Sequence, residues 1–277
     1  MTGSEALRSA VLRLKDAGVA DAARDARLLL AYAWGVASDR LTLNLAEDVS
    51  AYAALRFHAA IAARVLRQPV SQIIGERLFW GRVFAVTPDV LDPRPETEIL
   101  VSTALERPFA KMLDLGTGSG CILLSCLADR TMASGLGTDI SQAALKVAER
   151  NTAQLGLAAR ASFQLSNWCR EVLGRFDLIV SNPPYIAESE MPGLSPEVRD
   201  WEPHLALTPG GDGLESYRRI VAEAPARLMA QGRMMVEIGP SQGRAVAALF
   251  AAQGLAQIEI RRDMDGRDRV VLATKPA

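Results

Sequence analysis

Hydrophobic residues recur at helical spacing through the first 75 residues. Leu7, Val11 and Leu14 lie three or four positions apart, between Ser4 as a candidate N-cap and Gly18 as a candidate stop. Similar patterns lie around residues 21–35, 38–45 and 50–66. We therefore expect residues 1–75 to form a small helical bundle that is a domain of its own.

From residue 111 onward, short apolar runs alternate with helical patterns. This alternation predicts a parallel sheet with helices on both faces. Two last apolar runs, residues 258–261 and 270–274, flank a charged turn that contains glycine, which predicts an antiparallel hairpin at the C-terminus. The expected strands before that hairpin are residues 112–115, 136–138, 161–165, 176–181 and 233–238. Between the last two of these strands, we expect a helix from residue 214 to about residue 229.

A stretch of different character joins these two parts. Residues 70–86 alternate in the manner of a β-hairpin, and residues 92–98 add two prolines and a helix start. We therefore predict a hairpin and linker over residues 76–98 and an α/β domain over residues 99–277. The charges of Arg94 and Glu96 are expected to hold the two domains together.

Composition narrows the function. The chain has 277 residues, of which 49% are hydrophobic and 23% charged, so it can bury a sizeable core. A formal net charge of −1 argues against a protein that coats nucleic acid. Three cysteines without C-x-x-C spacing and two distant histidines predict no metal site. Without a membrane-spanning run or signal peptide, we expect a cytoplasmic protein.

A glycine-rich turn predicts a nucleoside cofactor. Gly116, Gly118 and Gly120 follow an apolar strand and precede a helix, where bare backbone can approach a ligand. Asp139 lies at the end of the next strand, where a carboxylate can bind two ribose hydroxyls. Both NAD and S-adenosylmethionine fit these residues, but NAD favours a G-x-G-x-x-G spacing that is absent here.

The sequence Asn-Pro-Pro-Tyr follows the strand that covers residues 176–181. The Asn182 side chain and the rigid backbone carbonyl of Pro183 offer two hydrogen-bond acceptors, and Pro184 fixes the loop. Tyr185 can supply an aromatic wall. Such a loop suits a planar group that carries an NH₂, either an amide or the exocyclic amine of a base. A cofactor that reacts with an NH₂ group is more plausibly a donor of an activated methyl group than a donor of hydride.

The order of motifs resembles the HemK/PrmC family, the glutamine N5-methyltransferases of class I peptide release factors. The strings are GERLFWG (75–81), PRPETE (93–98), LDLGTGSG (113–120), SNPPY (181–185), PGGDGL (209–214) and GRDRV (266–270). This resemblance implies a class I methyltransferase fold, Rossmann-like, with a mostly parallel seven-stranded sheet. It also implies that the chain methylates the glutamine of the Gly-Gly-Gln motif of a release factor, with S-adenosylmethionine as donor and S-adenosylhomocysteine as product. The N-terminal helical domain would then recognise the release factor.

The resemblance also assigns roles to residues of this sequence. Asn182, Pro183, Pro184 and Tyr185 would hold the substrate glutamine, with Asn182 also near the cofactor. The other cofactor-binding residues would be Gly116, Thr117, Gly118, Ser119 and Gly120 at the methionine part, Asp139 at the ribose, and Asn167 and Trp168 at the adenine. Relatives often have aspartate where Asn167 stands, so we expect a tuned affinity for the cofactor.

Two other functions compete with this one. An adenine-N6 methyltransferase on DNA or RNA could use the same acceptors on a flipped base. The near-neutral charge of the predicted bundle weighs against it, and we expect a monomer without direct nucleic-acid contacts. The fold could also serve only as a partner-binding module, but the intact cofactor motifs argue against a dead enzyme.

Overall fold

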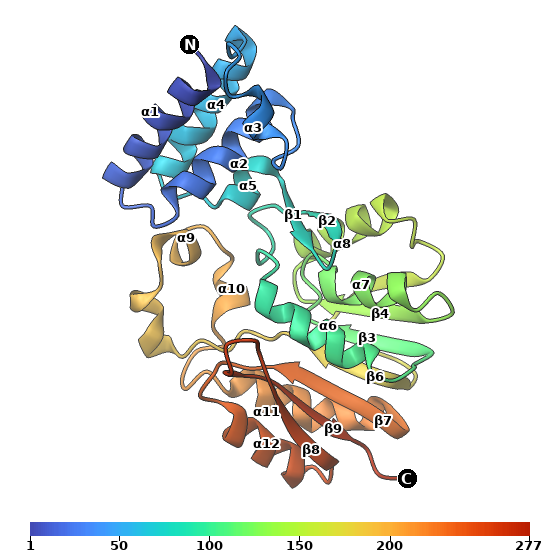
Figure 1. Cartoon of the computed structure of the whole chain (residues 1–277). Helices are drawn as coiled ribbons and strands as arrows, with labels where there is room; N and C mark the ends of the chain where they lie inside the picture. Colours follow the sequence, from blue (N-terminus) through green and yellow to red (C-terminus); the bar gives the residue numbers. More distant parts are fainter. The chain divides into compact units, whose positions relative to one another are not determined.

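The computed structural model describes all 277 residues. The chain forms two compact units, which are coloured along the sequence in Figure 1. Unit 1 comprises Met1–Glu76 and Ser195–Trp201, and unit 2 comprises Arg77–Leu194 and Glu202–Ala277. No helix is both long enough and apolar enough to cross a membrane.

Unit 1 is a bundle of helices around a small hydrophobic core. Its helices are α1 (Gly3–Asp16), α2 (Ala22–Trp34), α3 (Leu41–Asn44), α4 (Ala51–Val65), α5 (Val70–Ile74) and α9 (Pro196–Arg199). Leu14, Leu29 and Phe57 are buried between α1, α2 and α4. Thr2 and Glu5 form a capping box that fixes the start of α1. The helical character predicted for this segment is confirmed.

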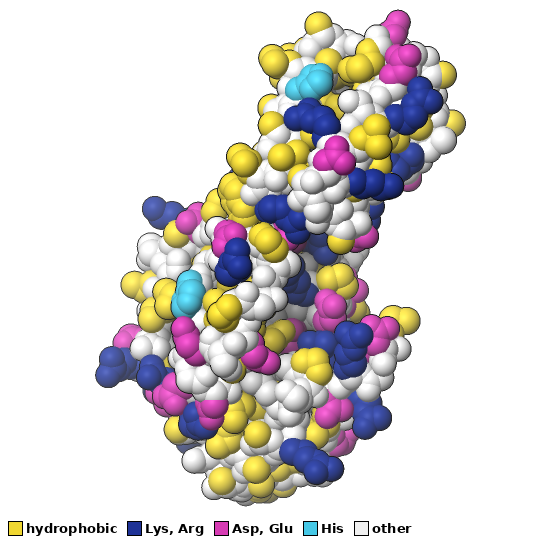
Figure 2. Space-filling model, turned by 90° about the vertical axis from the view of Figure 1, so that its left-hand side faces the viewer, with side chains coloured by type: hydrophobic (Ala, Val, Ile, Leu, Met, Phe, Trp, Pro, Cys, Tyr) yellow, Lys and Arg dark blue, Asp and Glu magenta, His cyan; other side chains and the backbone are white.

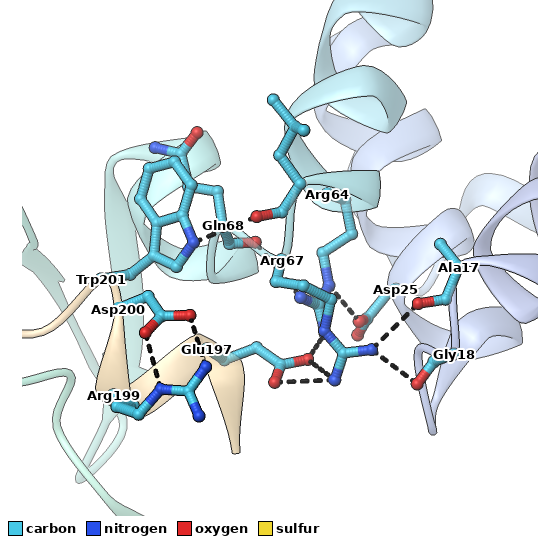
Figure 3. Close-up of polar contacts among 11 residues, drawn as sticks. Ala17, Gly18, Asp25, Arg64, Arg67, Gln68, Glu197, Arg199, Asp200 and Trp201 are labelled. Atoms are coloured by element: carbon cyan, nitrogen blue, oxygen red, sulfur yellow. Dashed lines mark hydrogen bonds and ion pairs between the residues drawn. The ribbon is translucent and has the colours of Figure 1, made fainter. Parts of the chain in front are cut away.

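A short piece of chain from far along the sequence completes unit 1. Glu197 of α9 accepts hydrogen bonds from Arg64 at 2.9 Å and from Arg67 at 2.8 Å (Figure 3). Arg64 also donates to Asp25 at 2.7 Å, and the Trp201 indole N–H donates to the Leu66 carbonyl at 3.1 Å. These contacts hold the segment 195–201 on the helices of unit 1.

Unit 2 contains a seven-stranded sheet in the order β5-β4-β3-β6-β7-β9-β8. Its strands are β3 (Lys111–Leu115), β4 (Ser134–Asp139), β5 (Ala161–Leu165), β6 (Phe176–Ser181), β7 (Leu228–Glu237), β8 (Ala256–Arg262) and β9 (Asp268–Thr274). The pairs from β5 to β7 are parallel, and β9 pairs antiparallel with both β7 and β8. The predicted α/β fold, with its mostly parallel sheet and C-terminal antiparallel hairpin, is confirmed.

Helices pack on both faces of this sheet (Figure 1). They are α6 (Glu98–Leu105), α7 (Cys121–Asp129), α8 (Gln142–Gln154), α11 (Glu215–Glu223) and α12 (Gly243–Ala252). The remaining helical elements of unit 2 are helix α10 (His204–Leu207) and the 3-10 turns η1 (Pro95–Thr97), η2 (Glu188–Gly193) and η3 (Ala224–Arg227). Met112 packs with α6 and α7, whereas its neighbour Leu113 packs with α11 and α12. Adjacent strand residues thus point to opposite faces of the sheet. Because helices cover both faces, both sets of side chains are buried, which explains the nearly continuous apolar runs of the sequence.

Two expectations about local structure are wrong. Residues 70–74 form helix α5, and only β1 (Glu76–Phe79) and β2 (Arg82–Ala85) make the expected hairpin. Gly75, at φ +85°, ends this helix in the left-handed conformation. The helix expected to continue from residue 214 to about residue 229 ends at Glu223, because Pro225 cannot continue the hydrogen-bond ladder.

Candidate active site

A cavity of about 510 Å³ lies in unit 2 at the carboxyl ends of the central strands. Its lining includes residues 116–119 after β3, Asp139 at the end of β4, residues 166–168 after β5, and Asn182 and Pro184 after β6. The register places Leu115 beside both Thr138 and Ser181, so these strand ends share one edge of the sheet. Open parallel sheets bind their ligands at this edge. Most predicted site residues therefore meet in one cavity, although Gly120, Pro183 and Tyr185 do not line it.

The glycine-rich turn is tied to its strand by a buried carboxylate. Asp114, fully buried in β3, accepts a hydrogen bond from the Thr117 hydroxyl at 2.7 Å. Burial raises the pKa of Asp114 to about 7, although the Thr117 hydroxyl opposes that rise. Gly120 has φ +79°, and a Cβ added there would lie 3.2 Å from the Cβ of Ala148. The turn needs glycine at this position for both its backbone conformation and its close packing.

Asp139 is held rigidly in the wall of the cavity. One carboxylate oxygen accepts from the Gly118 amide at 2.9 Å and the other from the Ser141 amide at 2.9 Å. Burial raises the pKa of Asp139, and these two amides oppose the rise. Ser141 also caps α8 by accepting from the Ala144 amide. The carboxylate therefore has a fixed position and lone pairs left for a ligand.

Trp168 supplies a flat wall from a strained backbone. Its φ is +55°, an unusual value for a bulky residue. The Ser166 hydroxyl donates to the Trp168 carbonyl at 2.8 Å and helps to hold this conformation. The indole ring lies against Gly116, where an added Cβ would be 3.5 Å from Trp168 Cζ3. Neighbouring Asn167 lines the same cavity. Strain of this kind is concentrated at ligand sites.

The Asn-Pro-Pro-Tyr loop is held in place by polar contacts with Thr97, Glu237 and Gln242. Asn182 Nδ2 donates to the Thr97 hydroxyl at 3.2 Å, which leaves the carboxamide oxygen Oδ1 free to accept. The Tyr185 hydroxyl lies 3.5 Å from Glu237 Oε1, and the Tyr185 carbonyl accepts from Gln242 at 2.9 Å. Burial raises the pKa of the Tyr185 hydroxyl, so this side chain stays neutral. Its ring packs against the hydrophobic core of unit 2.

The proline-rich segment before α6 contributes residues to the cavity that the sequence patterns did not identify. Arg94 and Thr97 both line it. Arg94 donates to both carboxylate oxygens of Glu202 at 2.7 Å, and both residues belong to unit 2. The expectation that the charge of Arg94 holds the two domains together is therefore wrong. Burial raises the pKa of Glu202 to about 7 in spite of this arginine. Arg94 and Thr97 both lie in the string PRPETE, whose prolines indicate a linker and do not by themselves indicate a site.

Comparison with known proteins agrees with this geometry. The model of the PrmC N-terminal domain matches residues 5–75, and that of the methyltransferase small domain matches residues 86–194. The release factor glutamine methyltransferase of Cereibacter sphaeroides is 58% identical over 277 residues, which is 100% of both chains. That of Rhodospirillum rubrum is 47% identical over 268 residues, covering 96% of this chain and 82% of the relative.

Solved structures share the fold. A methyltransferase from Pyrococcus furiosus has a TM-score of 0.54 at 18% identity, covering 78% of this chain and 98% of that one. The catalytic domain of hMettl16, in complex with an RNA hairpin, has a TM-score of 0.57 at 18% identity, covering 78% and 81%. The family resemblance predicted from the sequence is confirmed: the chain belongs to the release factor glutamine methyltransferase family.

Proposed function

We propose that this chain transfers the methyl group of S-adenosylmethionine to the side-chain amide nitrogen, N5, of the glutamine in the Gly-Gly-Gln motif of class I peptide release factors. The observation that carries this proposal is the unpaired oxygen of Asn182 at the cavity edge that also holds Asp139 and the glycine-rich turn. A glutamine amide offers the two N–H groups that this oxygen and the Pro183 carbonyl can accept. Membership of the family supports the same substrate.

The residues present fit the methyl donor. Residues 116–120 would face its methionine part, Asp139 would accept from its ribose hydroxyls, and Trp168 would cover its adenine, with Asn167 at the ring edge. A cavity of about 510 Å³ falls within the usual range for small-molecule sites. When bound, S-adenosylmethionine supplies a methyl group that its positive sulfonium activates for transfer.

The protein must orient a poor nucleophile. The lone pair of an amide nitrogen is delocalised into its carbonyl, so the nitrogen needs a fixed approach to the methyl carbon. By accepting both N–H bonds, Asn182 Oδ1 and the Pro183 carbonyl point the nitrogen into the cavity and favour the positive charge that grows on it. With the donor bound, the nitrogen would gain its new N–C bond as the S–C bond of the donor breaks. The nitrogen then loses one proton to solvent, since it becomes acidic only on alkylation.

Unit 1 is proposed to recognise the release factor. Residues 5–75 match the PrmC N-terminal domain, which supports a dedicated role for these helices. On the face drawn in Figure 2, basic and acidic side chains are interspersed, which favours a protein partner over a nucleic acid. We further propose that the chain acts as a monomer in the cytoplasm, where its three buried, unpaired cysteines stay reduced.

Methyl transfer from labelled S-adenosylmethionine tests the proposal. A purified release factor, the same factor with its Gly-Gly-Gln glutamine replaced, and adenine-containing DNA and RNA are offered in parallel. Label on the intact factor alone is expected. Label on nucleic acid would assign the site to adenine-N6 methylation, and label on the factor without that glutamine would place the target elsewhere.

A further inference from the structure

A buried acid lies behind the Asn-Pro-Pro-Tyr loop without a full set of partners. Glu237, the last residue of β7, is only 1% exposed. Its Oε2 atom has no hydrogen-bond partner, and its Oε1 atom is 3.5 Å from the Tyr185 hydroxyl. The register pairs Ser181 of β6 with Val236 of β7, so Asn182 and Glu237 follow neighbouring positions at the same edge of the sheet. Buried polar groups are normally hydrogen-bonded, so a buried carboxyl oxygen without a partner beside the site needs an explanation.

Thr97 lies between this acid and Asn182. Its side chain is buried, and its hydroxyl oxygen accepts from Asn182 Nδ2 at 3.2 Å. A hydroxyl that accepts one hydrogen bond still has its own hydrogen to donate. The Thr97 hydroxyl is close enough to the Glu237 carboxylate to lower its pKa, and Glu237 Oε2 is a buried acceptor that still lacks a partner. A hydrogen bond from Thr97 to Glu237 would therefore complete a chain from Glu237 through Thr97 to Asn182.

We propose that Glu237 and Thr97 are positioning residues that fix which end of the Asn182 carboxamide faces the substrate. A carboxylate can only accept, so the Thr97 hydroxyl must donate to it and its oxygen must accept from Asn182. Asn182 then has to present Nδ2 to Thr97, and Oδ1 is left for the substrate N–H. In the reverse orientation, an NH₂ group would face the substrate NH₂, and two donors would oppose each other. The inference rests on the function proposed for Asn182.

The direction of this chain depends on the proton of Glu237. Burial raises the pKa of Glu237 to about 7, opposed by Thr97 and by the charge of Arg269. Protonated Glu237 could donate to Thr97, which would then be free to donate to Asn182 and turn its oxygen away from the substrate. The ionised form is the productive one, so kcat is expected to rise with pH through about 7. The other titratable groups that face Glu237 are Glu96, Cys121, Tyr185 and Tyr217.

A hydroxyl swap at Thr97 tests the role of this side chain. Thr97→Val removes the hydroxyl at nearly constant volume, and we expect kcat to fall about 10-fold or more with an unchanged Kd for S-adenosylmethionine. Thr97→Ser keeps the hydroxyl and should restore most of kcat. Thr103→Val is the matched control, because Thr103 is equally buried and its hydroxyl bonds only to the Ile99 carbonyl of α6. Equal loss in the valine and serine variants, or in the control, would overturn the inference.

A double-mutant cycle separates this inference from the proposed function. If Thr97 acts through Asn182, then Thr97→Val should have no further effect on kcat in an Asn182→Ala background. Independent, multiplying effects would refute the positioning role while leaving the function of Asn182 intact. Full turnover in Asn182→Ala alone would instead refute the role that the proposed function gives to Asn182. In Glu237→Gln the rise of kcat near pH 7 should disappear, and a rise that persists would exclude Glu237 as its source.

Discussion

Replacing Asp139 by asparagine removes one charge from the wall of the cavity and leaves the volume of the side chain unchanged. In the wild type, the two carboxylate oxygens accept from the amides of Gly118 and Ser141. The asparagine NH₂ must face one of these N–H groups, and it can no longer accept from a ribose hydroxyl. A hydrogen bond to a charged group contributes about 1.5–3 kcal/mol. Losing one such bond should raise the Kd for S-adenosylmethionine about 10- to 100-fold.

Isothermal titration calorimetry of the purified protein measures this Kd directly. Asp177→Asn is the matched control, because Asp177 also accepts from two backbone amides, Ala110 at 3.0 Å and Lys111 at 2.8 Å. It lies near the start of β6, at the opposite end of the sheet from the cavity. The control should lower the melting temperature and change the Kd by less than about twofold. Wild-type affinity in Asp139→Asn, or equal weakening in the control, would refute the role given to Asp139.

Three further variants probe separate parts of the molecule. Asn182→Ala should lower kcat on the order of 100-fold in a protein that still binds S-adenosylmethionine, and unchanged turnover would exclude the proposed mechanism. Glu197→Gln should destabilise unit 1 by about 1–3 kcal/mol in chemical unfolding, whereas the exposed pair of Asp200 should contribute nothing measurable. Burial alone would raise the pKa of Glu197, but hydrogen bonds from Arg67 and Arg64 hold that pKa below its usual value. The stabilisation by Glu197 is therefore present above about pH 4.5 and is lost as the pH falls further. The stability of Glu197→Gln should not show this acid-induced decrease. Gly120→Ala should cost about 1–3 kcal/mol more than Gly254→Ala, since both have positive φ but only Gly120 has neighbours within 4 Å; equal costs would show that packing at Gly120 is unimportant.

Much of the fold and of the candidate site could be predicted because their signals are local. Apolar runs that alternate with helical patterns predict a parallel sheet, and the carboxyl ends of parallel strands meet at one edge. For that reason the glycine-rich turn, Asp139 and Asn182 could be expected together, although 66 positions separate Gly116 from Asn182. The structure does bring them to one cavity.

The rest depends on contacts without a local pattern. The segment 195–201 belongs to unit 1 through the ion pairs of Glu197 with Arg64 and Arg67, which lie 133 and 130 positions away in the sequence. Hydrophobic periodicity does not predict such pairs. Thr97 and Glu237 are likewise distant in sequence, and burial, which the sequence does not display, makes them notable. Helix α5 was missed because Val70, Ile73 and Ile74 are β-branched and favour strands, whereas tertiary packing made them helical.

The central claim is that the loop of Asn182 presents a glutamine amide nitrogen to the methyl donor. Tandem mass spectrometry of a release factor, incubated with this protein and S-adenosylmethionine, tests it most directly by locating the added methyl group. The account predicts a methyl on the side-chain nitrogen of the Gly-Gly-Gln glutamine with the wild type, and almost none with an Asn182→Ala protein that still binds S-adenosylmethionine. A methyl on any other atom, or equal modification by the variant, would contradict it.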